Sequence, residues 1–150
     1  MPDMNFVTDK REKYTFEELT GIIAALRSPE GGCPWDRVQT FESMKQYLVN
    51  ETQEVLQAVE KQDADNLCEE LGDVLLQVLL YSQIASDNGL FDISDVVDSI
   101  SRKMIRRHPH VFAGKPFSSR EELNDMWEEI KKQEKSQKTH GKRGCDTTKP

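Results

Sequence analysis

The strongest constraint on the fold is a helical spacing of apolar residues that runs through two long segments joined by a short turn. Apolar side chains recur every three or four residues from about Thr40 to Gln62, and again from about Asp65 to Ser86. No stretch alternates apolar and polar residues for long enough to predict a strand. Because the connection is short, we expect an all-α protein in which these two helices pack antiparallel.

One further helix is predicted before this pair. Thr15 and Glu18 fit a capping box, and the helix that they begin ends near Ser28. The segment at 29–36, PEGGCPWD, is rich in proline and glycine, which predicts a loop. We expect Trp35 to be the buried anchor of this loop.

Two more helices are predicted after the pair. One begins at Asp92 or Ser94 and ends before Pro109. The other begins at a capping box of Ser118 and Glu121. The expected architecture is therefore an antiparallel four-helix-type bundle with an additional C-terminal helix.

The 150 residues, of which 36% are hydrophobic, suit one domain with a modest core. We predict this domain at residues 1–135 and a disordered polar tail at 136–150. The helix at 65–86 is apolar on more than one side, which favours a homodimer or a larger homo-oligomer.

Charge and cysteine content argue against several classes of partner and site. With a net charge of -7, we expect neither polymeric nucleic acid nor an anionic membrane as a partner. Cys33, Cys68 and Cys145 are an odd number without a CxxC, which argues against a disulfide framework and a structural zinc site. Because no apolar stretch has the length of a signal peptide or a membrane span, we expect a cytoplasmic protein.

Four carboxylates interrupt the apolar faces of the two long helices. Glu51 and Glu54 lie on the inward face of the first helix, and Glu70 and Asp73 repeat their spacing on the second. Buried carboxylates repel one another and take up protons unless a cation neutralises them. Oxygen ligands select a hard cation, so we predict a Mg²⁺ or Mn²⁺ site. Solvated glutamates on helix surfaces are the alternative explanation.

Two pairs of residues further along the chain have the chemistry to bind an anion. Lys103 and Arg107 are one helical turn apart and offer two donors to phosphate oxygens, or they complement the end of a helix. Trp127 and Lys131 have the same spacing and fit an aromatic platform beside an ammonium group. Core packing would also explain Trp127.

Several motifs together resemble the MazG-type nucleoside triphosphate pyrophosphohydrolases over about Gly31 to Lys131. They are CPWD at 33–36 with Gln39 and Thr40, NETQE at 50–54, ELGD at 70–73 and KMIRRHPHVF at 103–112. One position departs from the family pattern. Asn50 stands where the family's EExxE has its first glutamate.

This resemblance implies a dimerising helical bundle that uses Mg²⁺ to hydrolyse a nucleoside triphosphate to the monophosphate and pyrophosphate. Matching positions imply metal ligands at Glu51, Glu54, Glu70 and Asp73, and nucleotide contacts at Lys103, Arg107, Trp127 and Lys131. We expect metal-activated water to attack the α-phosphorus, with Glu51 or Glu54 accepting its proton.

Two alternatives remain open at the level of sequence. The first is a non-catalytic helical interaction module whose acidic cluster binds a structural cation or a basic partner. The second is an enzyme restricted to dUTP or dCTP.

Overall fold

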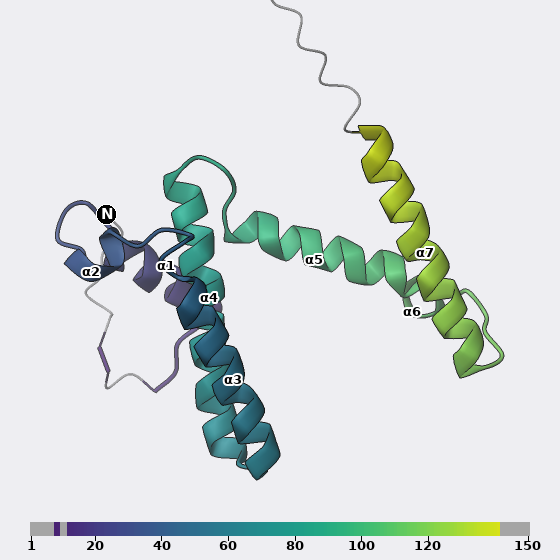
Figure 1. Cartoon of the computed structure of the whole chain (residues 1–150), viewed down its shortest axis with the longest axis horizontal. Helices are drawn as coiled ribbons and strands as arrows, with labels where there is room; N and C mark the ends of the chain where they lie inside the picture. Colours follow the sequence, from purple (N-terminus) through teal and green to yellow (C-terminus); the bar gives the residue numbers. More distant parts are fainter. Residues whose placement is uncertain (1–7, 10–11, 142–150) are drawn as a thin grey trace, which may run out of the picture. The chain divides into compact units, whose positions relative to one another are not determined.

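The computed structural model describes residues 8–9 and 12–141, and within them every regular element is a helix. The all-α prediction is therefore confirmed for these residues. The helices are α1 (Phe16–Leu26), α2 (Pro34–Arg37), α3 (Lys45–Lys61), α4 (Ala64–Asp87), α5 (Ile93–Arg107), α6 (Pro109–Phe112) and α7 (Arg120–Gly141) (Figure 1). No helix of the described part combines the length and the hydropathy that a membrane span needs.

The chain divides into two compact units, one on each side of the boundary between Val96 and Val97. The first unit contains α1 to α4 and the start of α5. The second contains the rest of α5 with α6 and α7. The sequence predicted one folded unit, so this division is a difference from the expectation, and each unit is described by itself.

The first unit is organised around a hairpin of α3 and α4, which lie side by side (Figure 1). Gln62 ends α3 in the left-handed conformation, with φ at 54°. Asp63 then caps α4 by accepting a hydrogen bond from the Asn66 amide at 3.1 Å. The short turn thus makes the two helices antiparallel, as predicted. Thr40 caps the turn before α3 rather than the helix, which begins only at Lys45.

The apolar core of the first unit lies where α1 packs on α4. Thr15 and Glu18 form the predicted capping box, with hydrogen bonds of 2.9 and 3.2 Å. The buried core residues come from α1, α4 and the turn before α3, namely Ile23, Met44, Leu79, Leu80 and Ile84. The outer faces of the hairpin keep apolar side chains in solvent, and Leu56, Val59 and Leu71 are more than half exposed.

The second unit differs from the sequence prediction in two details of α7. Ser119, not Ser118, accepts the hydrogen bond from a helical amide, that of Glu122, and the Glu122 carboxylate returns to the Ser118 amide. The predicted pair of Ser118 and Glu121 was therefore one residue early. α7 also continues to Gly141, past the predicted start of the tail, and residues 142–150 lie outside the described residues.

Candidate functional site

The α3–α4 hairpin brings three of the four predicted carboxylates together. One oxygen from each of Glu51, Glu70 and Asp73 lies within 4.8 Å of the others. Glu54 is exposed and is outside this group, although its charge still acts on Glu51 and Glu70. The antiparallel packing of two helices with the same three-residue spacing produces this carboxylate group.

Burial and repulsion by neighbouring carboxylates raise the pKa values of Glu51 and Glu70. Glu70 is only 9% exposed, and its Oε2 has no hydrogen-bond partner in the described residues. Its burial comes first among the causes that raise its pKa, followed by the charge of Glu54. The pKa of Glu51 is raised by its burial and then by the charges of Asp73 and Glu54. A partly buried cluster of negatively charged side chains favours the binding of a cation.

The spacing of these oxygens fits one divalent cation. Oxygens bound to a single Mg²⁺ at about 2.1 Å lie at most about 4.2 Å apart. The oxygens of Glu51, Glu70 and Asp73 lie within 4.8 Å of one another, which is close to this distance. A small adjustment of the side chains would therefore bring all three oxygens around one ion. The unpaired Oε2 of Glu70 is an acceptor that such an ion would satisfy.

Two nearby amide side chains add detail that the sequence did not resolve. Asn50 is exposed and accepts a hydrogen bond from Gln46 at 2.8 Å within α3, so it is not part of the carboxylate group. Gln77, one turn after Asp73 on α4, is 4% exposed, and its Oε1 has no partner among the described residues. Gln77 was visible in the sequence only as a polar interruption of the apolar run.

In the second unit, two cations lie over the indole of Trp127. Arg107 Cζ is 5.9 Å from the ring centroid, and Lys131 Nζ is 4.9 Å from it. The structure therefore groups three of the four predicted nucleotide contacts. Lys103 lies one turn before Arg107 on α5, is partly buried and makes no ion pair within the described residues.

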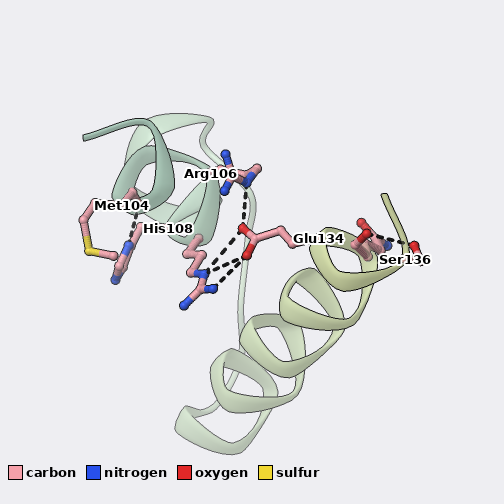
Figure 2. A network of polar contacts seen from close by, with 7 residues as sticks. Met104, Arg106, His108, Glu134 and Ser136 are labelled. Atoms are coloured by element: carbon pink, nitrogen blue, oxygen red, sulfur yellow. Dashed lines mark hydrogen bonds and ion pairs between the residues drawn. The ribbon is translucent and has the colours of Figure 1, made fainter. Parts of the chain in front are cut away.

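Both cations already have carboxylate partners. Glu134 on α7 binds Arg107 Nη2 at 2.7 Å and Arg106 Nε at 2.6 Å, and Figure 2 shows its side chain reaching towards Arg106. Lys131 binds Glu128 at 2.7 Å. The arginines lower the pKa of Glu134 to about 2, first through the hydrogen bonds of Arg107. Sequence reasoning missed Glu134, although its spacing from Lys131 places both on one face of α7.

A cleft of about 260 Å³ adjoins this group within the second unit. Arg107 and Trp127 line it together with Arg120 and Asn124, so its wall combines positive charge, an aromatic surface and an amide. His108 also lines it, with Nδ1 held 2.6 Å from the Met104 carbonyl oxygen. This wall has the chemistry to hold an anionic ligand with an aromatic part.

Comparison with known proteins places these two groups of residues in context. A family model described as the MazG nucleotide pyrophosphohydrolase domain matches residues 39–112. This range contains the four carboxylates, Lys103 and Arg107, whereas Trp127 and Lys131 lie beyond it.

Curated relatives and a solved structure extend the similarity. The chain is 50% identical over 135 residues to the nucleoside triphosphate pyrophosphohydrolase/pyrophosphatase MazG of Thermotoga maritima, covering 90% of this chain and 51% of that protein. It is 47% identical over 122 residues to the nucleoside triphosphate pyrophosphohydrolase of Escherichia coli K12, covering 81% and 46%. The chain thus spans about half the length of these relatives. A crystal structure of a MazG-related protein from Thermotoga maritima matches 77% of this chain and 98% of its own, with 34% identity and a TM-score of 0.65.

Proposed function

The chain belongs to the MazG nucleotide pyrophosphohydrolase family, and from this premise we propose that it hydrolyses nucleoside triphosphates to the monophosphate and pyrophosphate. The observation that carries the proposal is the carboxylate group on the hairpin, with three oxygens within 4.8 Å and an unpaired oxygen on buried Glu70. Four residues would hold the divalent cation, and they are Glu51, Glu54, Glu70 and Asp73.

The proposed cation is Mg²⁺, with Mn²⁺ as a substitute, because all the donors are carboxylate oxygens. When bound, such an ion neutralises phosphate charge and makes a water molecule more acidic. The reaction is the attack of water on the α-phosphorus with pyrophosphate as the leaving group. Glu51 or Glu54 accepts the proton from this water.

Cationic side chains of the second unit would stabilise the charge of the triphosphate. Arg107 offers a planar set of donors and Lys131 offers an ammonium group, and both lie over Trp127. Phosphate oxygens would replace Glu134 and Glu128 as their partners. Lys103 supplies a third positive charge from the preceding turn of α5, without a competing ion pair among the described residues.

We also propose a homodimer or larger homo-oligomer that completes the four-helix-type arrangement. The half-exposed apolar side chains of Leu56, Val59 and Leu71 support it, because they line helices whose opposite faces already pack together. Burial of these side chains against a second copy is favourable at about 25 cal/mol per Å² of apolar surface.

Pyrophosphate release tests the proposed activity. Purified protein is incubated with Mg²⁺ and each ribonucleoside or deoxyribonucleoside triphosphate, and pyrophosphate is measured. Loss of a metal ligand removes several kcal/mol of transition-state stabilisation, so Glu54→Gln and Asp73→Asn should lower kcat/KM by about 100-fold or more. The matched control is Glu60→Gln, which removes an exposed carboxylate on α3 and should leave the rate unchanged.

The outcomes separate the competing functions. Hydrolysis of dUTP or dCTP alone narrows the substrate without changing the reaction. Tight Mg²⁺ binding without pyrophosphate from any nucleotide contradicts the enzyme and favours a cation-binding module. Circular dichroism of each variant verifies that it is folded.

A further inference from the structure

Trp35 and Tyr47 form an exposed aromatic pair in the first unit. Their ring centroids are 5.6 Å apart and their planes meet at 89°, an edge-to-face arrangement. Trp35 is 47% exposed and Tyr47 is 41% exposed, so the prediction of a buried anchor at Trp35 was wrong. Aromatic rings gain more from burial than most side chains do. Two adjacent rings left half in solvent are therefore a surface suited to a ligand.

The backbone that follows Trp35 is held by a buried arginine. The side chain of Arg27 is 7% exposed, and its Nη1 donates to the carbonyl oxygens of Asp36 and Gln39 at 2.5 and 3.1 Å. Its Nε donates to Asp87 on α4 at 2.8 Å. Gln39 Nε2 in turn donates to the Trp35 carbonyl oxygen at 2.9 Å. The exposure of Trp35 is thus a property of an anchored segment.

Gly32 fixes the start of the same segment against α1. A Cβ at Gly32 would lie 2.7 Å from the Leu26 carbonyl oxygen, which is too close for any other residue. The Cys33 amide donates to that same oxygen at 2.8 Å. Close backbone contact therefore holds the residues that lead into α2.

The aromatic pair is adjacent to the carboxylate group. Tyr47 precedes Glu51 by one turn of α3, so the two side chains leave the same face of the helix. One turn advances about 5.4 Å along the axis. In a nucleotide only the ribose separates the base from the α-phosphate, so a ligand with its phosphates near Glu51 brings its base to this pair.

The other tryptophan of the chain is less available for stacking. The ring of Trp127 has Lys131 and Arg107 placed over it. In an edge-to-face pair, by contrast, the ring that presents its edge has both faces clear of its partner.

We propose that Trp35 and Tyr47 form the platform on which the nucleobase of the substrate stacks. This inference rests on the proposed function and adds a base-binding subsite to it. Because every base has a π face, such a platform strengthens the binding of all nucleotides without selecting one base. Base recognition would then belong to the first unit, beside the carboxylate group.

Tryptophan fluorescence tests the platform, because the chain has only two tryptophans. The ligand is an ATP analogue with a methylene group in place of the α,β-bridging oxygen, and inorganic tripolyphosphate is the base-free control. With Mg²⁺ present, the analogue should quench Trp35 in the Trp127→Phe protein, and tripolyphosphate should not. Quenching only of Trp127, seen in the Trp35→Phe protein, or no quenching of either, overturns the proposal.

Substitution of Trp35 supplies the second measurement. Trp35→Ala should raise the Kd of the analogue about tenfold or more and leave that of tripolyphosphate unchanged. Trp35→Phe, which retains a ring, should restore most of the affinity. Equal weakening of both ligands, or no weakening, contradicts the platform. If wild-type protein releases no pyrophosphate from ATP while Trp35 is still quenched, the proposed function fails and the platform stands.

Discussion

Replacement of Glu134 by Gln is expected to weaken the second unit in a manner that depends on pH. Glu134 joins Arg106 and Arg107 on α5 to α7, and its side chain is 14% exposed, against 15% for Arg107 and 52% for Arg106. The lowering of its pKa from 4.5 to about 2 corresponds to at most about 3.5 kcal/mol, at about 1.4 kcal/mol per pKa unit. Because Arg106 is half exposed to solvent, we expect Glu134→Gln to lower the free energy of unfolding by about 2 kcal/mol at pH 7.

The sign of the pH dependence follows from the direction of the change. A carboxyl group with a lowered pKa in the folded state stabilises the protein above its unfolded pKa, near 4.5. That contribution is lost as the pH falls from about 4.5 to about 2. The difference between wild type and Glu134→Gln should therefore be largest at neutral pH and should approach zero near pH 2.

Urea unfolding followed by Trp127 fluorescence measures this difference, in a Trp35→Phe background so that only the second unit is observed. Glu129→Gln is the matched control, because Glu129 is an exposed α7 carboxylate whose only described contact is a 3.4 Å bond to Gln133. Glu129→Gln should lower the free energy of unfolding by less than about 0.5 kcal/mol. A Glu134→Gln difference that is absent at pH 7, or equal at pH 7 and pH 3, refutes the reasoning.

Two further predictions concern the first unit. Mg²⁺ at 100 times its Kd should stabilise the first unit by about 2.7 kcal/mol, because the ion relieves repulsion in the carboxylate group. Thermal unfolding with and without Mg²⁺ measures this stabilisation. An equal response of the Asp73→Asn protein to Mg²⁺ contradicts the prediction. Gln77→Met should raise the free energy of unfolding by about 1 kcal/mol, because it removes a buried oxygen that has no partner among the described residues. Urea unfolding measures the change, and a marked loss of stability would show that Gln77 has a partner when the protein is in solution.

The parts of the structure that the sequence predicted well depend on neighbouring residues along the chain. Apolar periodicity identified the long helices, and the capping box at Thr15 and Glu18 located the start of α1. The meeting of Glu51, Glu70 and Asp73 also follows locally, because a short turn makes the two helices antiparallel and their spacing is shared. The features that the sequence did not predict involve either a choice between two neighbouring residues or a contact with a residue far away along the chain.

Three of the differences have identifiable physical causes. Ser118 and Ser119 both have a capping hydroxyl, and only backbone geometry decides that Ser119 faces the helical amides. Residues 136–141 lack an apolar stripe, yet the good helix formers Glu134, Lys135, Gln137 and Lys138 favour a helix without one, so α7 continues. Glu134 binds Arg107, which lies 27 residues earlier in the chain on another helix, and helical spacing does not predict contacts between residues so far apart.

The exposure of Trp35 shows how such distant contacts change the reading of a local pattern. A tryptophan in a loop rich in proline and glycine is expected to anchor that loop by its own burial. Here the anchor is Arg27, whose side chain is almost fully buried and binds the carbonyl oxygens of Asp36 and Gln39, just after the tryptophan. Since the arginine holds the segment, the indole is not needed for packing and remains available beside the carboxylate group. Replacement of Arg27 by an apolar residue should therefore displace Trp35 before it disturbs the α3–α4 hairpin.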